Sequence, residues 1–165
     1  MSPNTAGQRF RPVIRIGKRL MDGARSKRAS GVLADDARAE GFDVLAGHTH
    51  ALLVTYKRDG TGVPTPVWFA RDDDRVYVWT EINAFKAKRL RRDPRALLAP
   101  CGPTGAPQGP AVAARGRVLE DPQERERAAT VVRSQWGFGR RLFELVSRTV
   151  TDVHYLAFEV ADDDA

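Results

Sequence analysis

The sequence has little cysteine and no long hydrophobic run. Cys101 is its only cysteine, which excludes an intrachain disulfide and a zinc site built from cysteines. No apolar stretch approaches the ~20 residues that a membrane-spanning helix needs, and the N-terminal region lacks the apolar core of a secretory signal. With 165 residues, 42% of them hydrophobic and 29% charged, the sequence predicts one globular, cytoplasmic domain.

Acidic residues are scarce in one part of the chain only. Lys and Arg number 27 against 21 Asp and Glu, but residues 1–30 hold eight of the basic residues and a single acid, Asp22. We therefore predict a basic leader over 1–38 and a nearly neutral domain over 39–165. Because nucleic-acid binding needs clustered charge on the folded surface, no nucleic-acid partner is expected. The leader is expected to be a mobile arm or a helix packed on the domain, with contact to an acidic lipid surface as the alternative.

The common catalytic signatures are missing as well. The chain has no Gly-x-Ser-x-Gly elbow, no phosphate-binding Walker loop and no His-Glu-x-x-His zinc helix. His48 and His50 lack a third ligand nearby, so we interpret them as surface residues and expect no metal. Cys101 has no activating base beside it and is expected to be a buried residue at the end of a strand.

The pattern of apolar residues predicts a mainly β fold. Pro64 and Pro66 indicate an open edge or a bulge in the second strand, and Asn83 is a candidate cap for the helix that follows the third strand. Six strands that mostly follow one another predict a small antiparallel barrel with helices on its rim. We expect strands over 50–56, 63–70, 75–80, 96–101, 111–120 and 153–160, and helices over 84–92 and from 121 to about 148, the second split at Gly137 and Gly139.

A basic stretch follows the third strand. Six basic residues lie within ten positions, offset only by Asp93: Lys86, Lys88, Arg89, Arg91, Arg92 and Arg95. The N-terminus of a helix favours an anion, and aromatic residues precede this helix. The pattern indicates a ligand with an aromatic ring along the strands and a phosphate at the helix start. A solvated basic face is the simpler alternative.

Three segments carry a resemblance to a known family: YKRDGTGVPTPVWFA at 56–70, RVYVWTE at 75–81 and FKAKRLRRDPRALLAPC at 85–101. In this order and spacing they resemble the flavin and deazaflavin oxidoreductases that share the pyridoxamine 5′-phosphate oxidase-like split barrel, also called the FMN-binding split barrel. Within that superfamily the chain looks most similar to the actinobacterial branch of F420-dependent enzymes. The resemblance covers residues 42–120 well, and the final helix and strand loosely.

This resemblance implies a homodimer with two cofactor sites at the subunit interface. Phe85 departs from the small or basic residue that the family often has at this position. Trp68 and Trp79 have a simpler alternative role as barrel core. The implied cofactor contacts are Thr65, Pro66, Val67 and Trp68 along the ring, Trp79 and Thr80 at the cofactor side chain, and Lys86 at the phosphate, with Lys88 and Arg89 as further candidates.

We therefore predict an F420-dependent reductase that transfers a hydride between the deazaflavin and a small organic substrate. No catalytic acid is assigned, and solvent is expected to supply the proton. Positive charge beyond Lys86 favours F420, because that cofactor carries an anionic polyglutamate tail. The alternatives are an FMN-dependent oxidoreductase of the same fold, or a non-enzymatic protein that binds a flavin or haem.

Overall fold

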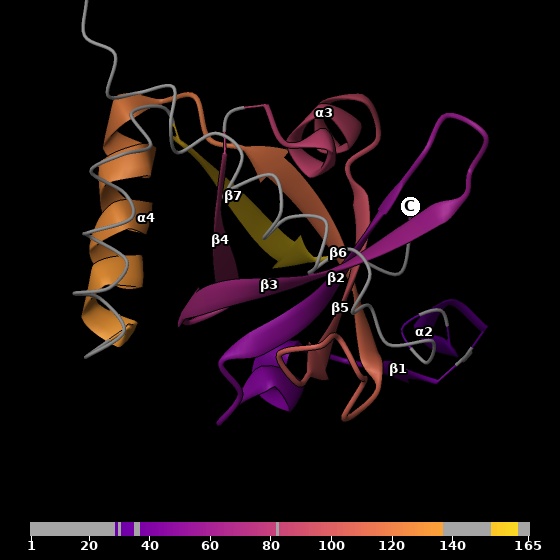
Figure 1. The fold of residues 1–165 in the computed structure, drawn as a ribbon. Helices are drawn as coiled ribbons and strands as arrows, with labels where there is room; N and C mark the ends of the chain where they lie inside the picture. Colours follow the sequence, from indigo (N-terminus) through magenta and orange to yellow (C-terminus); the bar gives the residue numbers. More distant parts are fainter. Residues whose placement is uncertain (1–28, 30, 35–36, 82, 137–152, 162–165) are drawn as a thin grey trace, which may run out of the picture.

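The computed structural model describes residues 29, 31–34, 37–81, 83–136 and 153–161, and its main feature is a sheet that closes on itself (Figure 1). The strands follow the order β6-β5-β2-β3-β4-β7, and β6 also pairs with β7, which confirms the six-stranded antiparallel barrel. The short β1 (Arg38–Ala39) adds to β6 in parallel. The six barrel strands are β2 (His50–Tyr56), β3 (Gly62–Asp72), β4 (Arg75–Glu81), β5 (Arg95–Cys101), β6 (Ala111–Val118) and β7 (Val153–Val160).

Both faces of β2 are buried, and they face different clusters. Leu53 points into the barrel interior, where it joins Val78 and Phe158. Leu52, one residue earlier, points outward and packs with Val32 of α2 (Gly31–Ala34), as strand alternation requires. The last residues of the leader region therefore pack on the barrel. The rest of that region, residues 1–28, lies outside the described residues, and a domain boundary at residue 38 stays a prediction.

Two short helices close the ends of the barrel. The 3₁₀ helix η3 (Phe42–Leu45) buries Phe42 and Leu45, while α3 (Phe85–Arg92) buries Ala87 and Leu90 in the same interior cluster. The expected cap at Asn83 is wrong. The helix begins one residue later than that prediction assumed, so Ala84 occupies the cap position, and it makes no side-chain cap hydrogen bond.

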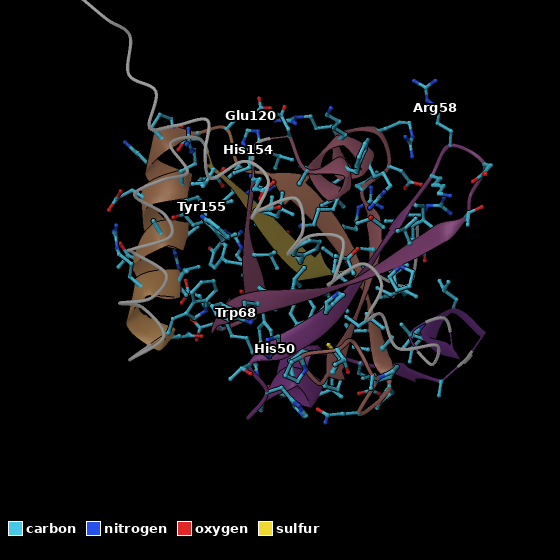
Figure 2. All side chains as sticks on the ribbon, viewed as in Figure 1. His50, Arg58, Trp68, Glu120, His154 and Tyr155 are labelled. Atoms are coloured by element: carbon cyan, nitrogen blue, oxygen red, sulfur yellow. The ribbon has the colours of Figure 1, made fainter. Side chains whose placement is uncertain are left out.

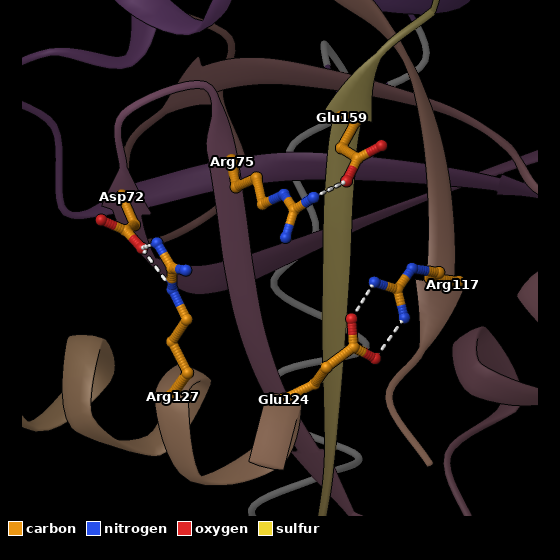
Figure 3. A network of polar contacts seen from close by, with 6 residues as sticks. All are labelled: Asp72, Arg75, Arg117, Glu124, Arg127 and Glu159. Carbon is orange, nitrogen blue, oxygen red and sulfur yellow. Dashed lines mark hydrogen bonds and ion pairs between the residues drawn. The ribbon is translucent and has the colours of Figure 1, made fainter. Parts of the chain in front are cut away.

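The long helix α4 (Pro122–Gln135) lies against the outside of the barrel (Figure 1). Asp121 caps it, because its Oδ1 accepts hydrogen bonds of 2.9 Å from the backbone N–H groups of Gln123 and Glu124. Ion pairs join Arg127 to Asp72 at 2.8 Å and Glu124 to Arg117 at 2.5 Å, which ties the helix to β3 and β6 (Figure 3). The predicted split at Gly137 and Gly139 lies outside the described residues.

Within the described residues, no helix combines the length and the apolar content that crossing a membrane requires.

Candidate functional site

Strands β3 and β4 pair over only part of their length. Their ladder runs from Asp72↔Arg75 to Phe69↔Val78 and stops there. Before Phe69, β3 pairs with β2 alone among the described strands, and after Val78, β4 pairs with β7 alone. The two strands therefore diverge and leave a fork, by which we mean the open edge of β3 over 62–68 and the end of β4 over 79–81.

The fork explains the two prolines of β3. Pro64 and Pro66 pair with Val54 and Leu52 of β2, and both lie in the stretch that has no second neighbour among the described strands. A proline cannot donate a ladder hydrogen bond, so it is tolerated where one side of the strand is open. The sequence predicted an open edge or a bulge at these positions, and among the described strands the structure has an open edge there.

The residues predicted to contact the cofactor lie on both sides of the fork. On β3, Thr65 and Pro66 are half-buried, Val67 lies in the barrel interior, and Trp68 is 43% exposed. The alternative role of Trp68 as barrel core is therefore wrong, because strand alternation turns it outward beside the inward-facing Val67. On β4, Trp79 is half-buried opposite Tyr155, while Thr80 is buried opposite His154.

Trp68 is held by two neighbours from distant parts of the chain. Its Nε1 donates a hydrogen bond to Nε2 of His50, and the two rings meet edge to face with centroids 5.7 Å apart. On its other side the Trp136 ring lies 5.1 Å away, also edge to face. Figure 2 shows His50 and Trp68 together at one end of the barrel, with His154 and Glu120 at the opposite end.

These contacts fix the protonation state of His50. Because Nε2 accepts from Trp68, the imidazole is neutral and carries its proton on Nδ1, which lies 2.8 Å from the hydroxyl of Thr49. Partial burial also lowers the pKa of His50 from its usual 6.5. Sequence reasoning missed both His50 and Trp136, because only the β2–β3 register and the position of α4 bring them to Trp68.

The basic residues of α3 divide into two groups. Two of them tie the helix to β2: Nε of Arg89 donates to the hydroxyl of Thr55 at 2.8 Å, and Arg92 donates to the carbonyl of Tyr56 at 2.5 Å. Lys88 is exposed, and its ammonium lies 5.6 Å from the centroid of the Phe85 ring, which is itself 74% exposed. In the described part of the chain, no carboxylate pairs with Lys88.

The other basic residues have acidic partners or intermediate exposure. Arg95 pairs with Asp93 at 2.8 Å, and Arg91 pairs with Glu120 at 3.6 Å. Lys86 is half-buried in the first turn of α3. Of the three predicted phosphate contacts, the structure thus places Lys86 and Lys88 near the start of the helix and gives Arg89 a bond to the barrel.

The start of α3 is basic and has no side-chain cap hydrogen bond. No side chain caps this N-terminus, whereas Asp121 caps α4. The N-terminal end of a helix carries a partial positive charge that attracts anions, and the two lysines add to it. The residues present therefore fit the phosphate of a cofactor whose ring lies along β3.

Among the described residues, neither the single cysteine nor the possible metal ligands form a second candidate site. Cys101 is the buried last residue of β5, as predicted, and burial raises the pKa of its thiol to about 11. Among the residues that the structure describes, no group of three or more His, Cys, Asp or Glu side chains could hold a metal ion.

Comparison with known proteins agrees with this geometry. Three solved structures share the fold at low sequence identity: a protein related to general stress protein 26, of the pyridoxinephosphate oxidase family, from Clostridium acetobutylicum (12% identity, TM-score 0.53, covering 80% of this chain and 84% of that one); the haem storage protein HutZ from Vibrio cholerae (13%, 0.54, 73% and 87%); and a FAD-binding protein from Mesorhizobium loti (16%, 0.51, 72% and 84%). No curated protein sequence matches the chain.

A match to a protein-family model adds evidence beyond the shared fold. The family model described as pyridoxamine 5′-phosphate oxidase matches residues 37–160, which include all six barrel strands, α3 and α4. The resemblance carried by the three sequence segments is thereby confirmed at the level of the family. The forked barrel and this match together show that the chain belongs to the pyridoxamine 5′-phosphate oxidase family, whose type of activity is oxidoreduction.

Proposed function

We propose that the chain is an F420-dependent reductase that binds the deazaflavin in the fork. One observation carries the proposal: the open edge of β3 faces the end of β4, and the uncapped, basic start of α3 follows β4 directly. A planar ring with a phosphate on its side chain needs these two features next to each other.

In this arrangement the backbone of Thr65–Trp68 contacts the ring, and Trp79 and Thr80 contact the side chain. Lys86 and Lys88 hold the phosphate. Arg89 acts through position rather than through the phosphate, because its bond to Thr55 anchors α3 to the barrel.

The residues of the chain orient the reactants and exclude water. A bound deazaflavin supplies a hydride donor or acceptor. Trp68 forms one wall beside it, fixed in place by His50 and Trp136. The Nδ1 proton of His50 is directed at the hydroxyl of Thr49, so we assign no side-chain acid and route the proton from solvent.

Charge on α3 favours F420 over FMN. Both cofactors need a phosphate site, but the polyglutamate tail of F420 needs further cations. Lys88 and Arg92 are exposed on this helix, and neither pairs with a carboxylate among the described residues. FMN remains the alternative cofactor.

We also propose that the protein is a homodimer whose two copies complete each site. The edge of β3 over 62–68 has no second strand beside it among the described residues, and such an edge next to an exposed tryptophan is a surface that folded proteins normally cover. Light scattering is expected to give about twice the 18.3 kDa of one chain, and a monomer at micromolar concentration would refute this part of the proposal.

Titration of the purified protein with F420 and with FMN tests the assignment. Lys86→Ala removes a charge-assisted hydrogen bond worth roughly 1.5–3 kcal/mol, so F420 should bind about ten- to a hundredfold more weakly. Lys57→Ala, in the exposed turn between β2 and β3, is the matched control and should bind as the parent does.

The competing outcomes are distinct. If FMN binds more tightly than F420, FMN replaces F420 as the proposed cofactor and the proposed site stays the same. Tight binding of haem without reductase turnover would support the non-enzymatic alternative. Unchanged F420 affinity in Lys86→Ala would show that the phosphate lies elsewhere.

A further inference from the structure

A small pocket lies beside the row formed by His50, Trp68 and Trp136. Residues 45–49, which lead into β2, form one side, and Phe69 and Arg71 of β3 with Gln135 and Trp136 at the end of α4 form the other. Its volume is about 170 Å³. An apolar cavity of ~150 Å³ accepts benzene, so this pocket has room for one six-membered ring.

The lining combines apolar walls with one permanent charge. Leu45, Phe69 and Trp136 supply the apolar surface, and among the described lining residues Arg71 alone has a permanent charge. The amide of Gln135 is already used, because its Oε1 accepts from the backbone N–H of Arg71 and its Nε2 donates to the Arg71 carbonyl. These two bonds fix the backbone from which the arginine side chain extends.

The guanidinium of Arg71 is only partly satisfied. Its Nη2 donates to Oδ1 of Asp43 at 2.8 Å, whereas its Nε is buried and has no hydrogen-bond partner among the described residues. The side chain of Asp43 is 97% exposed, so water competes for it and it is easily displaced. A guanidinium binds a carboxylate best through two parallel N–H bonds, which Asp43 does not provide here.

We propose that this pocket binds a small monocyclic aromatic carboxylate. The ring packs against Phe69 and Trp136, and the carboxylate binds the Arg71 guanidinium in place of Asp43. Two features explain why a ring is preferred over an aliphatic chain: the volume fits one ring, and the indole of Trp136 offers a flat apolar wall.

The pocket adjoins the fork through two direct contacts. The Trp136 ring, which lines the pocket, touches Trp68, and Thr49, which also lines it, contacts His50. A carboxylate bound here would therefore lie beside the ring of the cofactor as the substrate. This role as substrate site rests on the proposed function, whereas binding of the carboxylate does not.

Benzoate and benzamide are the probes, because they share a shape and differ in charge. Each is titrated into the ¹⁵N-labelled protein without cofactor, and the indole N–H signal of Trp136, assigned with Trp136→Phe, is followed. Benzoate should shift this signal and bind about tenfold more tightly than benzamide, as expected for a charge-assisted bond.

Three variants separate the proposal from a general effect of charge. Arg71→Met should weaken benzoate binding about ten- to a hundredfold and abolish the preference over benzamide. Asp43→Asn, which changes an exposed side chain, should strengthen benzoate binding about two- to fivefold by removing the competitor. Arg75→Met removes a neighbouring charge that pairs with Glu159 outside the pocket, and its affinity should equal that of the parent.

Equal binding of benzoate and benzamide would overturn the proposal, as would weaker benzoate binding in Asp43→Asn. The Asp43 result decides even if Arg71→Met fails to fold. The benzoate titration contains no cofactor, so a result that overturns this proposal does not bear on the F420 titration. Conversely, normal benzoate binding in a protein that binds no F420 would refute only the proposed function.

Discussion

Acidification should release Trp68 from His50, and this can be measured without any ligand. The hydrogen bond from Trp68 requires a neutral acceptor at Nε2, so protonation of the imidazole removes it. Burial lowers the pKa of His50 below 6.5, so the change in the folded protein falls below that pH. The residue opposite His50 on β5 is Cys101, whose thiol stays neutral because its pKa is about 11.

The sign of the stability effect follows from the two states. The unfolded chain takes up the proton near pH 6.5 and the folded chain only at lower pH, so the unfolded state binds more protons between these values. The contribution of neutral His50 to the free energy of unfolding is therefore full above pH 6.5 and is lost as the pH falls through the folded pKa. A hydrogen bond contributes about 0.5–1.5 kcal/mol, and the exposure of Trp68 places this one near the lower end, because water can replace the acceptor.

Tryptophan emission and urea unfolding, each followed from pH 8 to pH 4, measure the effect. His50→Gln keeps an acceptor but does not titrate, so its Trp68 emission should stay constant where that of the parent changes. His50→Phe removes the acceptor and should lose about 0.5–1 kcal/mol at pH 8. His154→Gln controls for the other histidine whose pKa is lowered, in its case by burial and then by Arg91 and Arg125. The reasoning fails if His50→Gln titrates like the parent.

Two further outcomes concern the packing of the barrel. Gly116→Ala should lower the free energy of unfolding by about 1–3 kcal/mol in urea titrations, because its Cβ would lie 2.4 Å from Cε1 of Phe158 on the neighbouring strand; an unchanged midpoint would contradict the close approach. Removal of residues 1–28 should leave cooperative thermal unfolding intact, whereas removal through residue 34 should lower the melting temperature, because Val32 then no longer covers Leu52. Equal melting temperatures of the two truncated proteins would show that α2 adds nothing.

Local patterns predicted the strands well. The apolar run at 50–56 and the strand at 153–160 have the bounds that the sequence indicated, because a buried strand carries its signal in its own residues. The prolines of β3 likewise predicted an open edge or a bulge, since their missing N–H is a local property. The placement of Thr65–Trp68 and of Trp79 and Thr80 on facing edges agrees with the resemblance, and their contact with a cofactor stays a prediction.

Features that depend on distant residues were not predictable in this way. The row of His50, Trp68 and Trp136 joins the first barrel strand to the end of α4, and no spacing in the sequence reports that contact. The pocket beside this row is likewise lined by residues that are distant in the sequence, so local patterns did not predict it. The Asn83 cap failed for a different reason: caps depend on where the helix begins, and a shift of one residue moves the cap to Ala84.

The strand that closes the barrel, β7, has a consequence for the folding of the chain during its synthesis on the ribosome. β7 (Val153–Val160) pairs with β4 and with residues 114–118 of β6, so β4 and this part of β6 lack one partner until the segment near residue 160 has left the exit tunnel. Until then the nascent chain exposes two unpaired edges and the apolar residues that Leu156 and Phe158 later cover. Such edges are templates for pairing between neighbouring nascent chains. Slow translation just before residue 153 would prolong this interval, whereas rapid synthesis of the last strand would shorten it.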